Sequence, residues 1–275
     1  MFTLNCKGRI LAITDPIVMG ILNTTPDSFY EGNRVQSENA LLRKAESMIN
    51  DGATLLDVGG QSTRPNSERI SPEEELKRVI PAIEALHQAF PEQIISVDTY
   101  YAVVAKEGVQ AGASIVNDVS AGTIDAGLLQ TVADLSVPYV LMHMLGNPAT
   151  MQKNPQYKNV TLDVFDSLSF KIKELEKMGI NDVIVDPGFG FGKTIAHNFQ
   201  LLRELLFFNQ LQKPLLVGLS RKGTVYKTLL TTADKALNGT TVLHTMALVN
   251  GATILRAHDV KEAKEAITLF LAYKK

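Results

Sequence analysis

The chain has 275 residues, of which 45% are hydrophobic and 20% charged, so it is long enough to bury a sizeable core. Its formal net charge of −2 gives no electrostatic case for nucleic acid or an anionic membrane, and its single cysteine, Cys6, excludes an intrachain disulfide. The N-terminus has no basic region followed by an apolar stretch, and no run approaches the roughly 18–20 apolar residues that span a bilayer, so a cytoplasmic protein is expected.

The chain begins with a predicted hairpin. Residues 2–4 and 9–13 are strand-like and flank Lys7-Gly8, which is a turn signal. We expect this hairpin to be structural and to plug one end of the main fold. Eight further strand-like runs follow, over residues 17–22, 54–58, 94–97, 114–116, 139–142, 183–185, 215–219 and 253–255.

Helix-like segments lie between these runs. Ser71-Pro72-Glu73-Glu74 is a capping box with proline at the first helical position, and it predicts the start of a helix. The segment 240–250 is apolar around most of its helical circumference, which indicates burial in the core or at a subunit interface. Apolar residues also recur at helical spacing over 41–49, 76–83, 165–175 and 263–271.

The alternation of strand and helix predicts the fold class. No low-complexity linker and no shift in composition divides the chain, so we expect one domain over residues 1–275. Eight β-then-α units at this length favour an α/β fold, namely a single (β/α)8 TIM barrel with an N-terminal β-hairpin. An open doubly wound sheet gives similar periodicity and is the alternative.

Polar residues follow the apolar strands. In chain order they are Asn23, Asp57, Asp98, Asn117, His143, Asp186, Lys222, and Arg256 with His258. In a (β/α)8 barrel the carboxyl ends of the strands carry the active site, so these side chains should converge above the core. Each residue alone has a structural explanation, such as a turn, a cap or a satisfied core histidine. Their joint occurrence points to a site, because partly buried polar groups need partners.

The clearest of these strand ends is Asp186. It follows the β-branched run 183–185, which is typical of a strand buried on both faces. Pro187 stops that strand, and three glycines follow before Lys193, so the backbone can turn sharply and approach a ligand. An acid facing a glycine-rich loop is therefore predicted at this end of the barrel.

The residue types indicate a ligand with a polar ring at one end and phosphate at the other. Carboxylates and amides suit a flat heterocycle, because one carboxylate accepts two parallel hydrogen bonds. Positive charge for an anion comes from Arg64, Lys222, Arg256 and His258. The P-loop pattern fails because Pro187 stands where glycine is required, the dinucleotide pattern fails at its third glycine, and a zinc site is unsupported.

Several motifs, in order, resemble the dihydropteroate synthase family over nearly the whole chain. They are Gly20-Ile-Leu-Asn-Thr-Thr-Pro-Asp-Ser-Phe29, Asp57-Val-Gly-Gly-Gln-Ser-Thr-Arg-Pro65, Ser96-Val-Asp98, Asn117-Asp-Val-Ser120, Asp186-Pro-Gly-Phe-Gly-Phe-Gly-Lys193, Gly218-Leu-Ser-Arg-Lys222 and Arg256-Ala-His258. One of these motifs alone is moderately specific, and the whole set in this order is highly specific.

The resemblance implies a (β/α)8 transferase of folate biosynthesis. Such an enzyme joins 6-hydroxymethyl-7,8-dihydropterin diphosphate to 4-aminobenzoate and releases 7,8-dihydropteroate and diphosphate, with Mg²⁺ as cofactor. The expected mechanism is dissociative substitution at the pterin methylene. The family forms homodimers through its late helices, so a homodimer is expected, without nucleic-acid or membrane partners.

The resemblance also assigns residues by matched position. The pterin positions are Asp98, Asn117, Met142, Asp186, Phe191 and Lys222; the diphosphate positions are Asn23, Thr63, Arg64, Arg256 and His258; the 4-aminobenzoate positions are Phe29, Thr63, Pro65, Phe191, Lys222 and Gly223. Asn23 is also the implied Mg²⁺ ligand through its side-chain oxygen. The implied catalytic residues are Asp98, Lys222, Arg256 and His258, and the loops that contain Phe29 and Pro65 are implied to close over the substrates.

The sequence departs from a common family pattern after Lys222. Many members have serine there, which helps to hold the carboxylate of 4-aminobenzoate, whereas this chain has Gly223. Two substitutes are available: backbone N–H groups at the start of a following helix, or the hydroxyl of Thr224.

Three alternatives from other classes stay open at this point. A pterin-binding methyltransferase of similar barrel shape, which passes a folate methyl group to a corrinoid protein, would share the ring-binding acids but would not need the segments 24–29 and 62–65. A Schiff-base aldolase would use Lys222 as its nucleophile. A non-catalytic barrel would bind a pterin, or contact a partner, without turnover.

Overall fold

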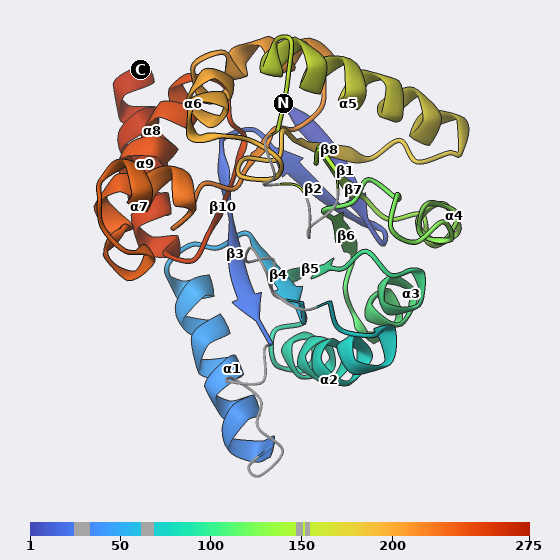
Figure 1. Cartoon of the computed structure of the whole chain (residues 1–275). Helices are drawn as coiled ribbons and strands as arrows, with labels where there is room; N and C mark the ends of the chain where they lie inside the picture. Colours follow the sequence, from blue (N-terminus) through green and yellow to red (C-terminus); the bar gives the residue numbers. More distant parts are fainter. Residues whose placement is uncertain (25–33, 62–68, 147–150, 152–154) are drawn as a thin grey trace.

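Short runs of β-branched residues build the centre of the molecule. In the computed structural model they form an eight-stranded parallel sheet with helices outside it (Figure 1). The strands are β3 (Ile17–Asn23), β4 (Leu55–Gly59), β5 (Ile94–Asp98), β6 (Ile115–Asp118), β7 (Tyr139–Met142), β8 (Val183–Asp186), β9 (Leu216–Val217) and β10 (Ile254–Ala257). The structure describes residues 1–24, 34–61, 69–146, 151 and 155–275.

The sheet closes on itself. Its strand order is β8-β7-β6-β5-β4-β3-β10-β9, and a parallel bridge between Val185 and Leu215 joins its two ends. An open doubly wound sheet reverses its strand order at a switch point and leaves two free edges. The (β/α)8 barrel is therefore confirmed over the open sheet. β9 is shorter than the predicted run 215–219, and Leu215, which precedes it, forms the closing bridge.

Helices connect successive strands on the outside of the barrel. They are α1 (Arg34–Asn50), α2 (Pro72–Ala89), α3 (Ala102–Ala111), α4 (Leu128–Leu135), α5 (Val160–Lys177), α6 (Ile195–Arg203), α7 (Gly223–Thr228), α8 (Leu237–Val249) and α9 (Val260–Lys274), with 3₁₀ turns η1 (Leu205–Leu211) and η2 (Ala233–Lys235). Ser71 caps α2 as predicted, because its hydroxyl accepts the N–H of Glu74 at 3.2 Å. The carboxylate of Glu74 pairs with Arg78 one turn later.

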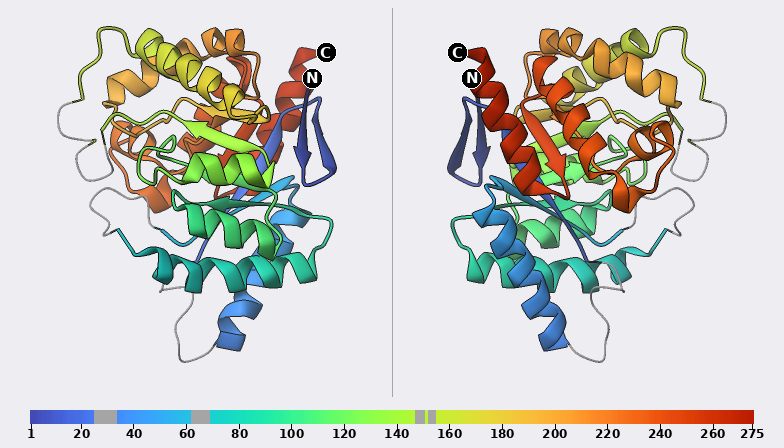
Figure 2. Two further views of the ribbon diagram at one scale, coloured as in Figure 1. Left: turned by 90° about the vertical axis from the view of Figure 1, so that its right-hand side faces the viewer. Right: turned by 90° about the vertical axis from the view of Figure 1, so that its left-hand side faces the viewer.

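The N-terminal hairpin plugs the bottom of the barrel. β1 (Phe2–Cys6) and β2 (Arg9–Ile13) pair antiparallel and lie at the end of the barrel where both chain termini are found (Figure 2). Alternate hairpin side chains, Leu4, Cys6, Leu11 and Ile13, are buried in one cluster with a ring of side chains from the barrel interior. That ring consists of Met19, Leu55, Ile94, Ile115, Val140, Ile184, Leu216 and Ile254. The structural role predicted for the hairpin is confirmed.

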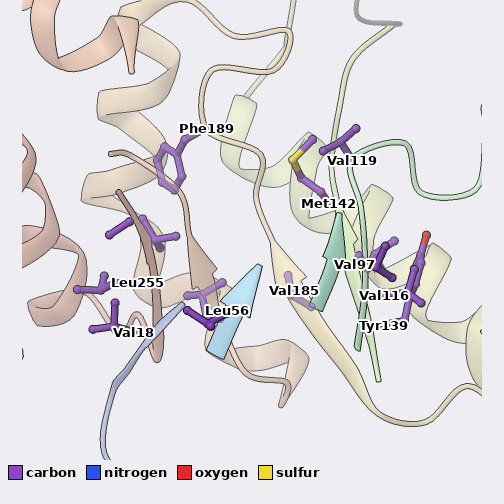
Figure 3. Close-up of a cluster of buried hydrophobic side chains, with 14 of the residues drawn as sticks. Val18, Leu56, Val97, Val116, Val119, Tyr139, Met142, Val185, Phe189 and Leu255 are labelled. Atoms are coloured by element: carbon purple, nitrogen blue, oxygen red, sulfur yellow. The ribbon is translucent and has the colours of Figure 1, made fainter. Parts of the chain in front are cut away.

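The outward faces of the same strands form the main core. Figure 3 shows side chains of this cluster, including Val18, Leu56, Val97 and Leu255, which come from four different strands. Successive residues of a strand point to opposite sides, so Leu55 lies in the barrel and Leu56 lies under the helices. Both faces are apolar at this level, which explains the continuous hydrophobic runs in the sequence.

The strand pleat also places the polar residues. Side chains two residues apart share a face, so each strand that contributes an apolar residue to the lower ring points its next inward residue toward the barrel mouth. The resulting pairs are Leu55 and Asp57, Ile94 and Ser96, Ile115 and Asn117, Ile184 and Asp186, and Ile254 and Arg256. The polar set therefore forms one layer directly above an apolar one.

Helix α8 is buried on one face only. Leu243, Ala247 and Leu248 are buried, as predicted, but Val242 and Met246 are 45% and 47% exposed. The exposed face carries apolar side chains that the described part of the chain leaves in contact with solvent. Apolar as it is, neither α8 nor any other helix of the described residues is long and apolar enough to cross a membrane.

Candidate active site

An ion-pair cluster occupies the mouth of the barrel. Arg256 on β10 donates from Nε to Oδ2 of Asp57 on β4 and from Nη2 to Oδ2 of Asp98 on β5, both at 2.6 Å. Asn117 on β6 donates from Nδ2 to the same oxygen of Asp57 at 3.0 Å. The other oxygen of Asp57 is buried and has no partner among the described residues. One guanidinium group thus pairs with two carboxylates from neighbouring strands, of which Asp57 is buried and Asp98 is partly buried.

Burial dominates the protonation of this cluster. It raises the pKa of Asp98 to about 7, although the positive charge of Arg256 opposes that rise. Burial alone lowers the pKa of Arg256, but the charges of Asp57 and Asp98 outweigh it and raise that pKa above its ordinary value. Arg256 is therefore always charged, whereas Asp98 changes its charge near neutral pH.

Asp186 stands at the next part of the rim, where the glycine-rich loop begins. Its Oδ1 accepts the backbone N–H of Gly188 at 2.7 Å. Gly188 has φ +74°, and a Cβ there would lie 1.8 Å from the carbonyl oxygen of His143, so only glycine fits. Burial raises the pKa of Asp186, and the charge of Lys222 is the main influence against that rise.

Lys222 approaches Asp186 from the other side of the site. It is the N-cap residue of α7, and its Nζ donates to the carbonyl oxygen of Phe189 at 2.6 Å. The same Nζ lies 4.7 Å from the centre of the Phe191 ring. Burial lowers the pKa of Lys222 to about 8, against the attraction of Asp186. Lys222 is thus a cation that faces both the acid and the aromatic wall of the loop.

A second lysine, Lys193, lies behind the same loop. It is 3% exposed, and its Nζ is 3.0 Å from Nδ1 of His143 and 2.9 Å from the carbonyl oxygen of Gly188. Burial lowers the pKa of Lys193 to about 7 and that of His143 to about 3. No role was predicted for Lys193, although it ends the glycine-rich motif; its position directly after the glycines was the one available signal.

His258 directly follows β10 and lies next to the cluster. Its Nδ1 lies 3.0 Å from Oγ of Ser220, and its backbone N–H donates to that same hydroxyl at 3.1 Å. Partial desolvation of the ring, and after it the charge of Arg256, lowers the pKa of His258 to about 4, although the residue keeps an exposed surface. The imidazole is therefore neutral at pH 7 and can offer a hydrogen bond. This differs from the positive charge expected of it from the sequence, because a partly desolvated ring beside a fixed cation disfavours its own protonation.

An ion pair that the sequence did not suggest joins two of these segments. Arg221 donates from Nε and Nη2 to the two carboxylate oxygens of Asp259, at 2.8 and 2.7 Å. Arg221 precedes Lys222 and has φ +53°, and Asp259 follows His258. The pair therefore links the segment that carries Lys222 to the segment that carries His258.

The remaining assigned residues fall into three groups. Met142 and Phe191 are buried at the ends of β7 and the glycine-rich loop, and Gly223 begins α7. Asn23 ends β3, is exposed, and pairs in register with Gly59, the strand neighbour of Asp98. Phe29, Thr63, Arg64 and Pro65 lie outside the described residues.

The residues at the barrel mouth could hold Mg²⁺ only together with oxygen atoms of a bound substrate. Among the described residues no three His, Cys, Asp or Glu side chains come together as a metal cage. Asn23 is an exposed amide at the rim, and its oxygen is a hard ligand of the kind that Mg²⁺ accepts alongside waters and phosphate oxygens.

Known proteins share both the sequence and the fold. The family model described as pterin binding enzyme matches residues 19–258. Dihydropteroate synthase of Escherichia coli (strain K12) is 44% identical over 263 residues, which are 95% of this chain and 93% of that protein. The crystal structure of Yersinia pestis dihydropteroate synthase with a sulfonamide drug has a TM-score of 0.93 at 41% identity, covering 99% of both chains. Xanthomonas albilineans dihydropteroate synthase in complex with 7,8-dihydropteroate has a TM-score of 0.88 at 39% identity, again covering 99% of both.

The closed barrel and the acids at its mouth, with the family match, define a pterin-binding barrel enzyme. Within that class, identity of 40–44% over almost the full length extends to several bacterial relatives. The chain belongs to the dihydropteroate synthases, the transferases of folate biosynthesis.

Proposed function

We propose that this chain joins 6-hydroxymethyl-7,8-dihydropterin diphosphate to 4-aminobenzoate, with the residues at the barrel mouth in the roles set out below. The observation that carries the assignment is the convergence of side chains from six strands or strand ends on one rim. These are Asp57, Asp98, Asn117, Asp186, Lys222 and Arg256. Support also comes from the relatives whose structures hold 4-aminobenzoate and 7,8-dihydropteroate.

The pterin ring is proposed to lie between Asp186 and the Asp98–Asn117 edge. Asp186 accepts two N–H donors of the ring, one at each carboxylate oxygen. Oδ2 is available for the first, and Oδ1 accepts the second in addition to the N–H of Gly188. Asn117 offers an amide oxygen to the ring while its Nδ2 stays on Asp57. Lys222 moves its donor from the Phe189 carbonyl to the ring carbonyl. Met142 and Phe191 pack on the ring faces.

The diphosphate is proposed to lie on the Asn23, Arg256 and His258 side. The guanidinium group of Arg256 has N–H donors beyond the two that bind Asp57 and Asp98. His258, neutral, contributes a hydrogen bond through its Nε2 while Nδ1 faces Ser220. Thr63 and Arg64 are proposed to complete this side. Charge on the leaving group is therefore matched by one fixed cation and several neutral donors.

The proposed mechanism is dissociative substitution at the pterin methylene. The bond from methylene carbon to diphosphate oxygen breaks first, and Arg256 and His258 stabilise the charge that develops on the leaving oxygens. The pterin ring delocalises the positive charge left behind, and ionised Asp98 and Asp186 favour that cation. The amine of 4-aminobenzoate then forms the new C–N bond and releases one proton. An aromatic amine is neutral at pH 7, so no residue is assigned as general base.

Mg²⁺ is proposed as the cofactor, held by the side-chain oxygen of Asn23 together with oxygens of the substrate diphosphate. When bound, it would neutralise charge on the departing diphosphate. The role of Asn23 is to orient that end of the substrate at the rim. An Asn23→Ala variant should need a higher Mg²⁺ concentration for half-maximal rate, and its affinity for the diphosphate-free pterin should be unchanged.

The second substrate is proposed to bind where α7 begins. Gly223 and Thr224 present the first backbone N–H groups of that helix, which have no intrahelical acceptors. The ammonium group of Lys222 adds charge for the carboxylate. Phe29, Pro65 and Phe191 are proposed as the apolar walls of this pocket.

A homodimer is proposed, formed across the exposed face of α8. Val242, Met246 and Val249 lie on that face, and Leu206 of η1 is also exposed beside the helix end, near Gly251. Apolar side chains gathered on one face in this way are typical of an interface. We also propose that residues 1–275 fold as one domain that works in the cytoplasm, a setting that suits the free, buried Cys6.

One experiment tests the function directly. The purified protein is incubated with both substrates and Mg²⁺, and the products are separated. Formation of 7,8-dihydropteroate and diphosphate in equal amounts is expected. Pterin binding without dihydropteroate would favour a non-catalytic barrel, and transfer of a folate methyl group in its place would favour a methyltransferase.

A further inference from the structure

The glycine-rich loop of residues 188–192 is held at its backbone by side chains from outside the loop. Two of its carbonyl groups accept hydrogen bonds from one ammonium group, that of Lys193, at 2.9 Å for Gly188 and 3.1 Å for Phe191. Other bonds come from Lys222 to the Phe189 carbonyl, from Tyr157 to the Gly192 carbonyl, and from the Gly190 N–H to Asn198. Lys193 is the residue that binds both ends of the turn.

The ammonium group of Lys193 is saturated. It has three N–H donors, and four acceptors lie within 3.3 Å of Nζ. Two of them belong to the loop and two, Nδ1 and the carbonyl oxygen, belong to His143 at the end of β7. A buried ammonium group is costly unless it is bonded in this way. Lys193 therefore ties the loop to the strand beside it.

His143 serves as a fixed acceptor in this arrangement. An ammonium group only donates, so Nδ1 of His143 accepts and the ring proton is on Nε2. The low pKa of His143, about 3, has burial as its first cause and the charge of Lys193 as its second. His143 is therefore a neutral acceptor at and above pH 5, while Lys193, whose pKa burial lowers to about 7, is mainly a charged donor below pH 7.

Lys193 also acts on Asp186 through charge. The pKa of Asp186 is raised by burial and lowered by Lys222, by the Gly188 N–H, and by Lys193 and Arg256. In return, Asp186 opposes the burial that lowers the pKa of Lys193. The ionised acid and the charged lysine favour each other. Ionised Asp186 is the form that accepts two donors from a ring.

We propose that Lys193 is a positioning residue for the pterin end of the site: its ammonium group fixes the glycine-rich loop against His143 and keeps Asp186 ionised and Phe191 in place. This inference rests on the proposed pterin-binding role of Asp186. Lys193 itself lies behind the loop and does not touch substrate. Lys193 contributes by holding the loop in shape and by favouring the ionised form of Asp186.

The test measures binding of 6-hydroxymethyl-7,8-dihydropterin by calorimetry, without 4-aminobenzoate, in full-length protein between pH 5 and 9. Lys193→Met removes the donors and the charge while keeping the length of the side chain. Lys106→Met, the same change at an exposed position of α3, is the matched control. For Lys193→Met we expect a dissociation constant about tenfold higher or more at pH 6.5, where Lys193 of the wild type is mainly charged. The control should bind as the wild type does.

The pH profile separates positioning from a general loss of stability. Loss of the Lys193 charge raises the pKa of Asp186, so the acidic limb of pterin binding should move to higher pH. The groups that face this acid are Lys222, Lys193 and Arg256, with His143 behind the loop. A variant weakened equally at every pH, with its acidic limb unmoved, would overturn the proposal, as would wild-type affinity.

Two further variants complete the design. If Lys193→Met does not fold, His143→Leu removes the Nδ1 acceptor and leaves the lysine in place, and a several-fold weaker affinity for the pterin is expected. Wild-type affinity in folded His143→Leu would overturn the proposal. Asp186→Asn tests the underlying function separately: retained pterin affinity there would refute the site assignment, whatever Lys193→Met does.

Discussion

Arg256 donates to Asp98 across 2.6 Å at the top of the barrel, from a strand that is three places away in the sheet. The same guanidinium group binds Asp57, so the proposed diphosphate side and the proposed pterin side share one cation. A change in the charge of Asp98 should therefore affect binding at both proposed ends of the substrate. Enzyme activity should depend on the protonation of Asp98 for this reason.

The acidic limb of the activity profile should reflect Asp98. Burial raises its pKa to about 7, so the ionised form predominates only above that pH, and kcat/KM should rise through neutral pH. Asp98→Asn removes the titrating group. We expect that variant to lose about 10²–10³ in kcat/KM and to lose the limb near pH 7. A profile for Asp98→Asn with the wild-type limb would assign the titration to another group.

Lys222 should matter far more than an ordinary lysine. It faces Asp186 and the Phe191 ring and is proposed to bind both substrates, so Lys222→Met should lower kcat/KM by about 10²–10³. Asn117→Ala should have an effect of the same order, because it removes the proposed ring contact and one of the two donors to Oδ2 of Asp57. Steady-state kinetics on both variants, with exposed Lys261→Met as the control, give the comparison. Near-wild-type turnover of Lys222→Met would remove it from the mechanism.

Gly223 is a position where a side chain can be added. A Cβ there would lie 3.7 Å or more from its nearest neighbours, in Tyr226 and Lys227, which is ordinary contact. Gly223→Ser should therefore fold normally and, by adding a hydroxyl beside Lys222, lower KM for 4-aminobenzoate by roughly three- to tenfold. The contrasting variant is Gly188→Ser, which meets a backbone oxygen at a positive φ and should lose at least about 1–3 kcal/mol of stability. An unchanged KM in Gly223→Ser would place the carboxylate elsewhere.

Glu75 should make folding stability depend on pH. It is fully buried in α2, and burial raises its pKa to about 8, although the nearby Thr99 hydroxyl opposes that rise. The unfolded chain ionises this group near 4.5, so between about pH 4.5 and 8 the folded state binds more protons and stability falls as pH rises.

Denaturant unfolding at several pH values tests this dependence. Glu75→Gln should be more stable than the wild type at pH 8, by an amount of the order of 3 kcal/mol, and the two should converge below pH 4.5. Glu84→Gln, exposed on the same helix, is the control and should follow the wild type. Equal slopes for Glu75→Gln and the wild type would contradict the raised pKa.

The fold could be predicted because its signals are local. The predicted runs 183–185 and 253–255 lie in β8 and β10. The observed strands end only one or two residues later, at Asp186 and Ala257. What periodicity could not decide was closure. The bridge between Val185 and Leu215 depends on the tilt of the whole sheet, and no single segment encodes it.

The sequence predicted which residues form the site, but only some of the contacts between them. The pleat brings Asn117 and Asp186 to one rim, two places beyond the inward residues Ile115 and Ile184, because residues two places apart share a face. Asp98 shares that face on β5, two places beyond Ser96. The sequence could not show that Arg256 would bind two acids, or that partial desolvation and the charge of Arg256 would leave His258 neutral. Those outcomes depend on distances across the barrel and on solvent exclusion, which strand spacing does not specify.

The exposed face of α8 gives the last prediction. Val242, Met246 and Val249 are apolar and exposed on a helix whose other face is buried. If this face joins two copies of the chain, a charge placed on it must be desolvated, and association should weaken. Met246→Lys should therefore shift the protein from dimer toward monomer in light scattering at micromolar concentration. The control is Phe170→Lys, which places the same charge at an apolar residue of α5 that is 66% exposed, and it should leave the mass unchanged. A monomeric wild type, or equal masses for wild type and Met246→Lys, would refute the α8 interface.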